Sequence, residues 1–205
     1  MKTILWDFDG VIIDSNSIRD LGFRSILKAF DKEKVEELIK YHQYNGGLSR
    51  YIKIRYFYNE IMNIEISDTE VKKLAEEFSV IMKKKLTDKT VLINDSVNFI
   101  KKNYNNYNFH IVSGSDQAEL RFLCKKLGLS EYFKSIHGSP TPKNELVLNL
   151  LNNSGYSEST VCLIGDSIND YEAAQLNGIK FFGYNNKSLE SKSSSYIKSF
   201  DAFFV

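Results

Sequence analysis

Four short, mostly continuous apolar segments are the feature of this 205-residue sequence that most restricts its fold. They lie at residues 3–6, 109–112, 161–164 and 179–182. Because their apolar residues run together instead of alternating with polar ones, each segment is typical of a strand covered on both faces. Helical patterns lie between the later segments, at residues 117–127, 143–151 and 171–176. The pattern predicts an α/β fold: a Rossmann-like parallel sheet with helices on both faces.

The segment from residue 17 to residue 88 has a different pattern, with helix after helix and no convincing strand. One run of apolar residues at helical spacing comprises Val71, Leu74, Ala75, Phe78 and Met82. Ser67 and Glu70 match the capping box that begins such a helix. We therefore expect a helical cap domain, residues 17–88, inserted after the first strand of a core made by residues 1–16 and 89–205. We also expect a last short strand at residues 202–205.

Composition and charge exclude several classes of protein. The 27 basic and 26 acidic side chains nearly cancel, so the balance does not suggest nucleic acid as a partner. No stretch approaches the ~18 consecutive apolar residues typical of a membrane span, so we expect no membrane partner. Cys124 and Cys162 lie in apolar surroundings without metal-ligand spacing, which suits reduced thiols. We expect a cytoplasmic protein, either a monomer or a weak homodimer.

Polar residues follow the apolar segments at the points where the predicted strands end. They are Asp7, Asp9, Ser113, Gly114, Asp166 and Asp170. In a parallel sheet the ligand crevice lies at the carboxyl ends of the strands, so these residues should converge there. A single aspartate at such a place is usually a turn or cap residue. Four aspartates together, with a lysine, are harder to explain as turn residues alone.

In this order the residues resemble the four motifs of the haloacid dehalogenase superfamily. The first motif is similar to Asp7-Phe8-Asp9-Gly10-Val11, the second to Ser113-Gly114, the third to Lys143 and the fourth to the segment at residues 165–170. The resemblance spans the chain. It departs from the common pattern at the third motif, where many relatives have proline after the lysine and this chain has Asn144.

The resemblance implies a role for each of these residues. Asp7 would be the nucleophile that forms an aspartyl phosphate, and Asp9 would first protonate the leaving group and then activate water. Mg²⁺ would be held by Asp7, by Asp166 and by the backbone carbonyl of Asp9. Asp170 would be a further ligand or would support the others. Ser113, the N–H of Gly114 and Lys143 would hold the phosphoryl oxygens.

Three features bear on the reaction within this superfamily. Asp9 argues against dehalogenation, because a halide leaving group needs no proton. Gly165 favours a phosphatase over a β-phosphoglucomutase-like enzyme, since such mutases commonly have glutamate before the metal-binding aspartate. The cap segment at residues 45–50 resembles the mutase grip on a second phosphate. It suggests that Arg50, assisted by Arg19, reads the distal part of the substrate.

The resulting expectation is a Mg²⁺-dependent phosphatase of the phosphoglycolate phosphatase or β-phosphoglucomutase-like subgroup. Its substrate would be a small phosphomonoester, either a sugar phosphate or a compound like phosphoglycolate. Two alternatives stay open: a sugar phosphomutase and a non-catalytic module that binds a phosphorylated metabolite. His42, His110 and His137 are expected to have structural roles.

Overall fold

The structure is a computed structural model that describes residues 2–203. Its sheet contains five parallel strands in the order β3-β2-β1-β4-β5. Their bounds are β1 Thr3–Trp6, β2 Asn108–Asp116, β3 Ser135–Ser139, β4 Val161–Gly165 and β5 Lys180–Gly183. The predicted α/β class is confirmed. Trp6 pairs with Ile111 on one side and Ile164 on the other, so the strands that precede the candidate residues end at one level.

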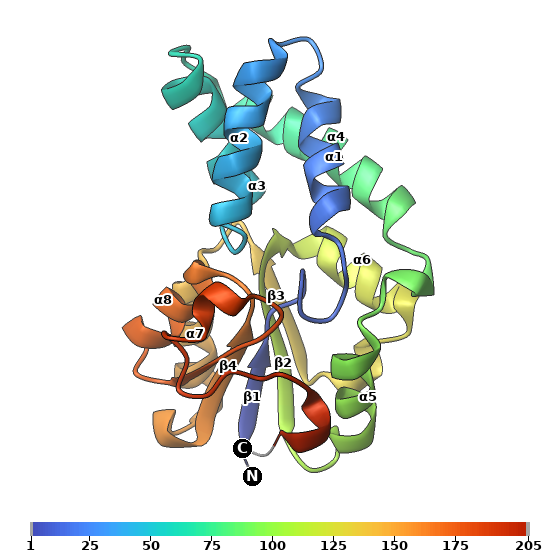
Figure 1. The fold of residues 1–205 in the computed structure, drawn as a ribbon, viewed down its shortest axis with the longest axis vertical. Helices are drawn as coiled ribbons and strands as arrows, with labels where there is room; N and C mark the ends of the chain where they lie inside the picture. Colours follow the sequence, from blue (N-terminus) through green and yellow to red (C-terminus); the bar gives the residue numbers. More distant parts are fainter. Residues whose placement is uncertain (1, 204–205) are drawn as a thin grey trace.

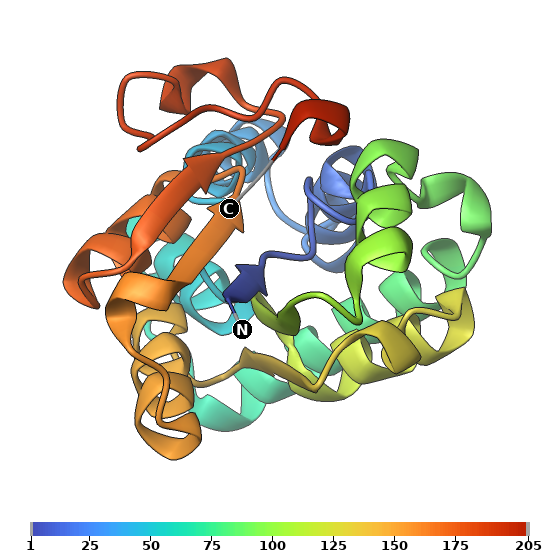
Figure 2. The same cartoon turned by 90° about the horizontal axis from the view of Figure 1, so that it is seen from below.

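Successive residues of the central strand face opposite layers of helices. Ile4 and Trp6 belong to the core on one face, together with α5 (Asn94–Asn103) and α6 (Gln117–Leu127). Leu5 belongs to the core on the other face, which includes residues of α7 (Lys143–Ser154) and α8 (Ile168–Leu176). Figure 2 shows these two layers along the strands. Both faces are covered, which is why the central strands are apolar without alternation.

Four helices stand beyond the carboxyl ends of the strands (Figure 1). They are α1 (Asn16–Ile26), α2 (Lys32–Tyr44), α3 (Arg50–Tyr56) and α4 (Asp68–Lys85), with a π-helical turn at Phe57–Ile61. The side chain of Ser67 caps α4 in the expected capping box. Phe23 of α1 packs on Phe78 of α4 with ring centroids 4.7 Å apart. We keep residues 17–88 as the proposed bounds of the cap, and we call this group of helices the cap.

Single turns of 3-10 helix complete the described fold. They lie at Lys89–Val91, Ser130–Tyr132, Glu158–Thr160, Lys187–Leu189 and Phe200–Ala202. The last of them occupies the start of the strand expected at residues 202–205. There Phe200 packs against Trp6, with ring centroids 5.3 Å apart, instead of extending the sheet. Residues 204 and 205 of that expected strand lie outside the described residues. Within residues 2–203, no helix is long and apolar enough to cross a membrane.

Candidate active site

Asp7 begins the loop that leaves β1 at the carboxyl edge of the sheet. Its backbone N–H donates a hydrogen bond of 2.9 Å to the carbonyl of Ile164, so the loop stays tied to β4. Gly10 has a φ of +73°, and a Cβ built on it would lie 1.9 Å from Oδ2 of Asp166. Only glycine tolerates both the positive φ and the close approach of Asp166. The turn therefore brings the first motif against the fourth motif.

Three carboxylates and one lysine meet at this edge. One oxygen from each of Asp7, Asp166 and Asp170 lies within 4.8 Å of the others. The Nζ atom of Lys143 lies 2.9 Å from Oδ1 of Asp7, and it also forms an ion pair with Asp170. Asp170 is fully buried and accepts hydrogen bonds from the N–H and hydroxyl of Ser167. The predicted nucleophile, third motif and fourth motif are thus brought together.

The charges of this cluster are only partly balanced. Burial raises the pKa of Asp7 to about 7, and the nearby Asp170 adds to this effect. Burial and the charge of Asp7 also hold the pKa of Asp166 well above its usual range. Burial alone would lower the pKa of Lys143, but Asp170 and Asp7 outweigh it and raise that pKa. One lysine faces three carboxylates, so one further cation of higher charge would relieve the repulsion.

These residues fit a bound Mg²⁺ ion. The three carboxylates offer hard oxygen ligands within a few ångströms of one another, and Asp166 is partly open to solvent. The raised pKa values of Asp7 and Asp166 are those expected of acidic ligands without a cation. Asn16 donates a hydrogen bond of 3.3 Å to Asp166, and Asn186 donates one of 2.7 Å to its carbonyl. The ligand set is therefore held in place from two sides.

The side chain of Asp9 points away from this cluster and toward the cap. Its Oδ1 accepts hydrogen bonds from Ser15 and from Nε of Arg19, and its Oδ2 accepts one of 2.5 Å from Ser115. Burial alone would raise its pKa, but Arg19 and the two serines together lower it. The carboxylate of Asp9 is thus held ionised. The three-carboxylate cluster does not include it, so its expected contact with a metal would be through the backbone carbonyl alone.

The second motif lies at the end of β2, next to the cap. Ser113 and Gly114 line the same cavity as Asp7 and Asp9. The N–H of Ser115 donates to Oγ of Ser113 over 3.2 Å. A Cβ built on Gly114 would lie 2.2 Å from the carbonyl oxygen of Gly47 in the cap. Glycine at residue 114 therefore allows the cap loop to lie directly on the strand end.

The two arginines predicted to read the substrate are both tied to one glutamate of α6. Arg19 Nη1 lies 2.8 Å from Oε1 of Glu119, and Arg50 Nη1 lies 2.7 Å from its Oε2. Glu119 is fully buried. Both arginines line the cavity, and one nitrogen of each, Nη2, has no hydrogen-bond partner among residues 2–203. The arginines thus join the cap to the core, and each keeps donors for a ligand.

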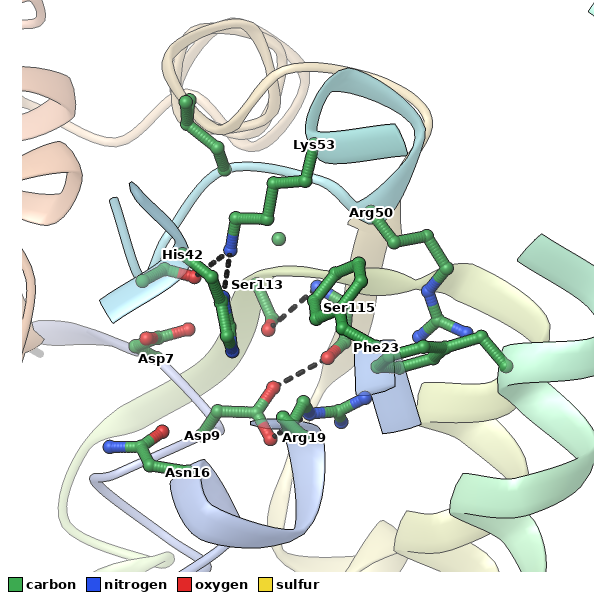
Figure 3. Close-up of a pocket in the computed structure, with 14 residues that line it drawn as sticks. Asp7, Asp9, Asn16, Arg19, Phe23, His42, Arg50, Lys53, Ser113 and Ser115 are labelled. Atoms are coloured by element: carbon green, nitrogen blue, oxygen red, sulfur yellow. Dashed lines mark hydrogen bonds and ion pairs between the residues drawn. The ribbon is translucent and has the colours of Figure 1, made fainter. Parts of the chain in front are cut away.

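One cavity residue, Lys53, was not predicted from the sequence, and His42 lies beside it. Lys53 lies on α3 one turn after Arg50, and its Nζ contacts Nδ1 of His42 over 2.8 Å. Figure 3 shows both side chains reaching from the cap over Asp7 and Asp9. His42 was expected to have a structural role, and Lys53 was not among the predicted site residues. The available signal was the spacing of Arg50 and Lys53, which puts both cations on one side of the helix.

Comparison with known proteins finds one matching family and many structures of similar fold. The model of a family described as haloacid dehalogenase-like hydrolase matches residues 4–184. A search of curated proteins finds no significant match. Many solved structures have a similar fold.

Three of the similar structures cover nearly all of the chain. A predicted phosphoglycolate phosphatase from Haemophilus somnus has a TM-score of 0.73 at 18% identity, covering 98% of this chain and 95% of its own. A β-phosphoglucomutase from Clostridium difficile has a TM-score of 0.78 at 18% identity, covering 100% and 93%. A mutant of CbbY from Rhodobacter sphaeroides, in complex with xylulose-(1,5)bisphosphate, has a TM-score of 0.79 at 14% identity, covering 98% and 96%. At these identities, the likeness is one of fold.

Proposed function

Because this chain belongs to the haloacid dehalogenase-like hydrolase family, we propose that it is a Mg²⁺-dependent phosphatase that forms an aspartyl phosphate on Asp7. The observation that carries this proposal is the contact of Asp7 with Lys143, 2.9 Å apart, beside the carboxylates of Asp166 and Asp170. A carboxylate attacks phosphorus only where the negative charge of both partners is neutralised. Here a lysine and a fitting cation site adjoin the same carboxylate.

The chain's own residues divide the reaction between them. A carboxylate oxygen of Asp7 attacks phosphorus, and the bond to the leaving oxygen breaks as that oxygen takes a proton from Asp9. Water then attacks the phosphorus, gives its proton to Asp9 and releases inorganic phosphate, which restores Asp7. Lys143, Ser113 and the N–H of Gly114 hold the phosphoryl oxygens throughout. Mg²⁺ held by Asp7, Asp166, Asp170 and the Asp9 carbonyl would supply further charge neutralisation.

The cap bears on which phosphate ester is accepted. The cavity that Asp7 and Asp9 line beneath the cap is about 30 Å³, room for roughly two water molecules. We expect the cap to lift from the carboxyl ends of the strands when a phosphate ester enters. Once the cap has closed again, a compact leaving group fits best. We propose a small phosphomonoester as the substrate, either a sugar phosphate or a compound like phosphoglycolate, with Arg19 and Arg50 in contact with it.

One position supports hydrolysis over phosphoryl transfer between sugar hydroxyls. A Cβ built on Gly165 would lie 2.3 Å from Cβ of Asp170. The glutamate that such mutases commonly have at this position would therefore displace Asp170. Lys143 would then lose Asp170 as its ion-pair partner. The fold likeness to a β-phosphoglucomutase keeps the mutase as the alternative to be tested.

The test is a panel of phosphate esters with Mg²⁺, in which free phosphate and isomerised sugar phosphate are measured in the same reactions. A phosphatase releases one phosphate for each ester consumed. Isomer without phosphate release, dependent on a bisphosphate activator, would establish the mutase instead. Mg²⁺ binding without turnover of any ester would establish a non-catalytic module.

A further inference from the structure

Lys53 is a buried cation above the nucleophile whose contacts are all with neutral groups. Its side chain lines the cavity that also contains Asp7 and Asp9, and the residue is only 2% exposed. Its Nζ donates to Nδ1 of His42 over 2.8 Å and to the carbonyl of Gly46 over 3.1 Å. An ammonium group has three N–H donors, so one of them is left for another acceptor.

The other cations of the site are matched by carboxylates. Arg19 is paired with Asp9 and Glu119, Arg50 with Glu119, and Lys143 with Asp7 and Asp170. Lys53 has no carboxylate within 4.0 Å among residues 2–203. On the cap side of the cavity, three cations therefore face the two carboxylates of Asp9 and Glu119. Of these three cations, Lys53 is the one that no carboxylate of the described residues within 4.0 Å balances.

His42 positions Lys53 without cancelling its charge. Burial and the charge of Lys53 lower the pKa of His42 well below its usual range, so the ring is neutral and its Nδ1 accepts the hydrogen bond. The nearest carboxylate beyond the ring is Asp20, whose Oδ1 lies 3.7 Å from Nε2 of His42. Asp20 thus faces the opposite nitrogen of the ring and accepts a hydrogen bond from Gln43. The lysine is held in place while its charge faces the cavity.

A buried charge without a partner of opposite charge costs free energy. Its presence above the candidate catalytic residues therefore points to an anionic ligand that pairs with it. We propose that Lys53 is a specificity-determining residue that binds a second anionic group on the leaving side of the phosphate ester, for which a carboxylate is the compact choice. The inference rests on the proposed phosphatase activity. It assigns the substrate to phosphomonoesters with two anionic groups, such as phosphorylated hydroxy acids.

The test compares two substrates of the same shape. One is the phosphate ester of glycolate, which carries a carboxylate, and the other is the phosphate ester of glycolamide, which carries a neutral amide in its place. For the unaltered protein we expect kcat/KM to favour the carboxylate by roughly 10- to 100-fold, as for a charge-assisted hydrogen bond. In Lys53→Met the preference should vanish, while phosphate release from the amide ester continues. Lys40→Met, which removes an exposed cap lysine, should keep the preference.

The outcomes separate this inference from the proposed function. If the unaltered protein releases phosphate from neither ester nor from p-nitrophenyl phosphate, the phosphatase proposal fails. If it hydrolyses both esters with equal kcat/KM, or if Lys53→Met keeps the preference, the inference about Lys53 is overturned and the phosphatase proposal stands. A further comparison measures kcat/KM for ethylene glycol bisphosphate and for ethylene glycol monophosphate. It shows whether Lys53 binds a second phosphate as it binds a carboxylate.

A second measurement needs no variant and covers the case in which Lys53→Met does not fold. Burial lowers the pKa of Lys53 to about 7. The ionisable groups that face it are His42, Asp9, Asp20, Arg19, Arg50 and Lys143. Because the two esters share the same phosphoryl group, the ratio of their kcat/KM values cancels its titration. We expect the ratio to fall as pH rises through about 7, and a ratio constant from pH 6 to pH 8.5 would contradict the inference.

Discussion

The Nε atom of Arg19 lies 2.7 Å from Oδ1 of Asp9, and the side chain of Arg19 is only 6% exposed and that of Asp9 16%. Asp9 is the residue proposed to give a proton to the leaving group, yet this contact favours its ionised form. The charge of Arg19 therefore opposes the acid step and supports the later step, in which Asp9 takes a proton from water. The approach of a negatively charged phosphoryl group would offset the effect of Arg19.

Replacing Arg19 should move the pH dependence of the reaction in a defined direction. Because protonated Asp9 is needed for the acid step, kcat/KM falls as pH rises through the pKa of Asp9. Arg19→Met removes the largest influence that lowers this pKa, so the falling limb of the profile should shift to higher pH. The measurement is kcat/KM against pH with an alkyl phosphate.

Two controls make this result specific. With p-nitrophenyl phosphate, whose leaving group needs little protonation, the limb should not move. Arg24→Met removes an exposed arginine paired with Glu36 and should leave the profile unchanged. An unshifted limb for Arg19→Met with the alkyl ester would contradict the role of Asp9 as the acid.

Gly165 should tolerate no side chain. In Gly165→Ala the new Cβ would overlap the side chain of Asp170, which is held by Ser167 and Lys143. Displacing Asp170 releases Lys143 from its place beside Asp7, and we expect kcat to fall on the order of 100-fold. The matched control is Gly155→Ala, where nothing lies within 4 Å of the added atom. It should reduce stability through its φ of +64° while kcat stays near normal, and equal kcat in both variants would contradict this account.

The carboxylate cluster should make stability depend on pH and on the metal together. The folded-state pKa of Asp7 is raised from 3.8 to about 7, and that of Asp166 is also raised. Between pH 3.8 and about 7, the folded protein therefore binds more protons than the unfolded chain. As a result, these two carboxylates make the free energy of unfolding fall as pH rises through this range.

If Mg²⁺ is held by the deprotonated carboxylates as proposed, its stabilising effect should grow as pH rises over the same range. Urea unfolding at pH 5 and pH 7, with Mg²⁺ or with a chelator, measures both effects. Asp166→Asn should weaken the dependence on pH and on Mg²⁺, and the exposed Asp201→Asn should keep both. A gain from Mg²⁺ that is equal at the two pH values would contradict the proposed ligand set.

The parts of the fold that follow from local pattern were predictable. Apolar strands covered on both faces required a parallel sheet, and a parallel sheet brings the residues after its strands to one edge. β3 was missed, because it is a short edge strand of mixed polarity at Ser135–Ser139. The ion pairs of Arg19 and Arg50 with Glu119 could not be predicted from the sequence either. Glu119 lies 100 residues after Arg19 and 69 residues after Arg50. Only that pairing makes Lys53 the unmatched cation.

The central claim is that phosphate passes through a covalent ester on Asp7. The most direct measurement is a single turnover stopped by acid within milliseconds, followed by peptide mass spectrometry of the segment containing Asp7 and by hydroxylamine treatment. We predict one phosphoryl group on Asp7 that hydroxylamine releases, and neither adduct nor turnover in Asp7→Asn. Normal phosphate release by Asp7→Asn, with no adduct at any time point in the unaltered protein, would contradict the mechanism.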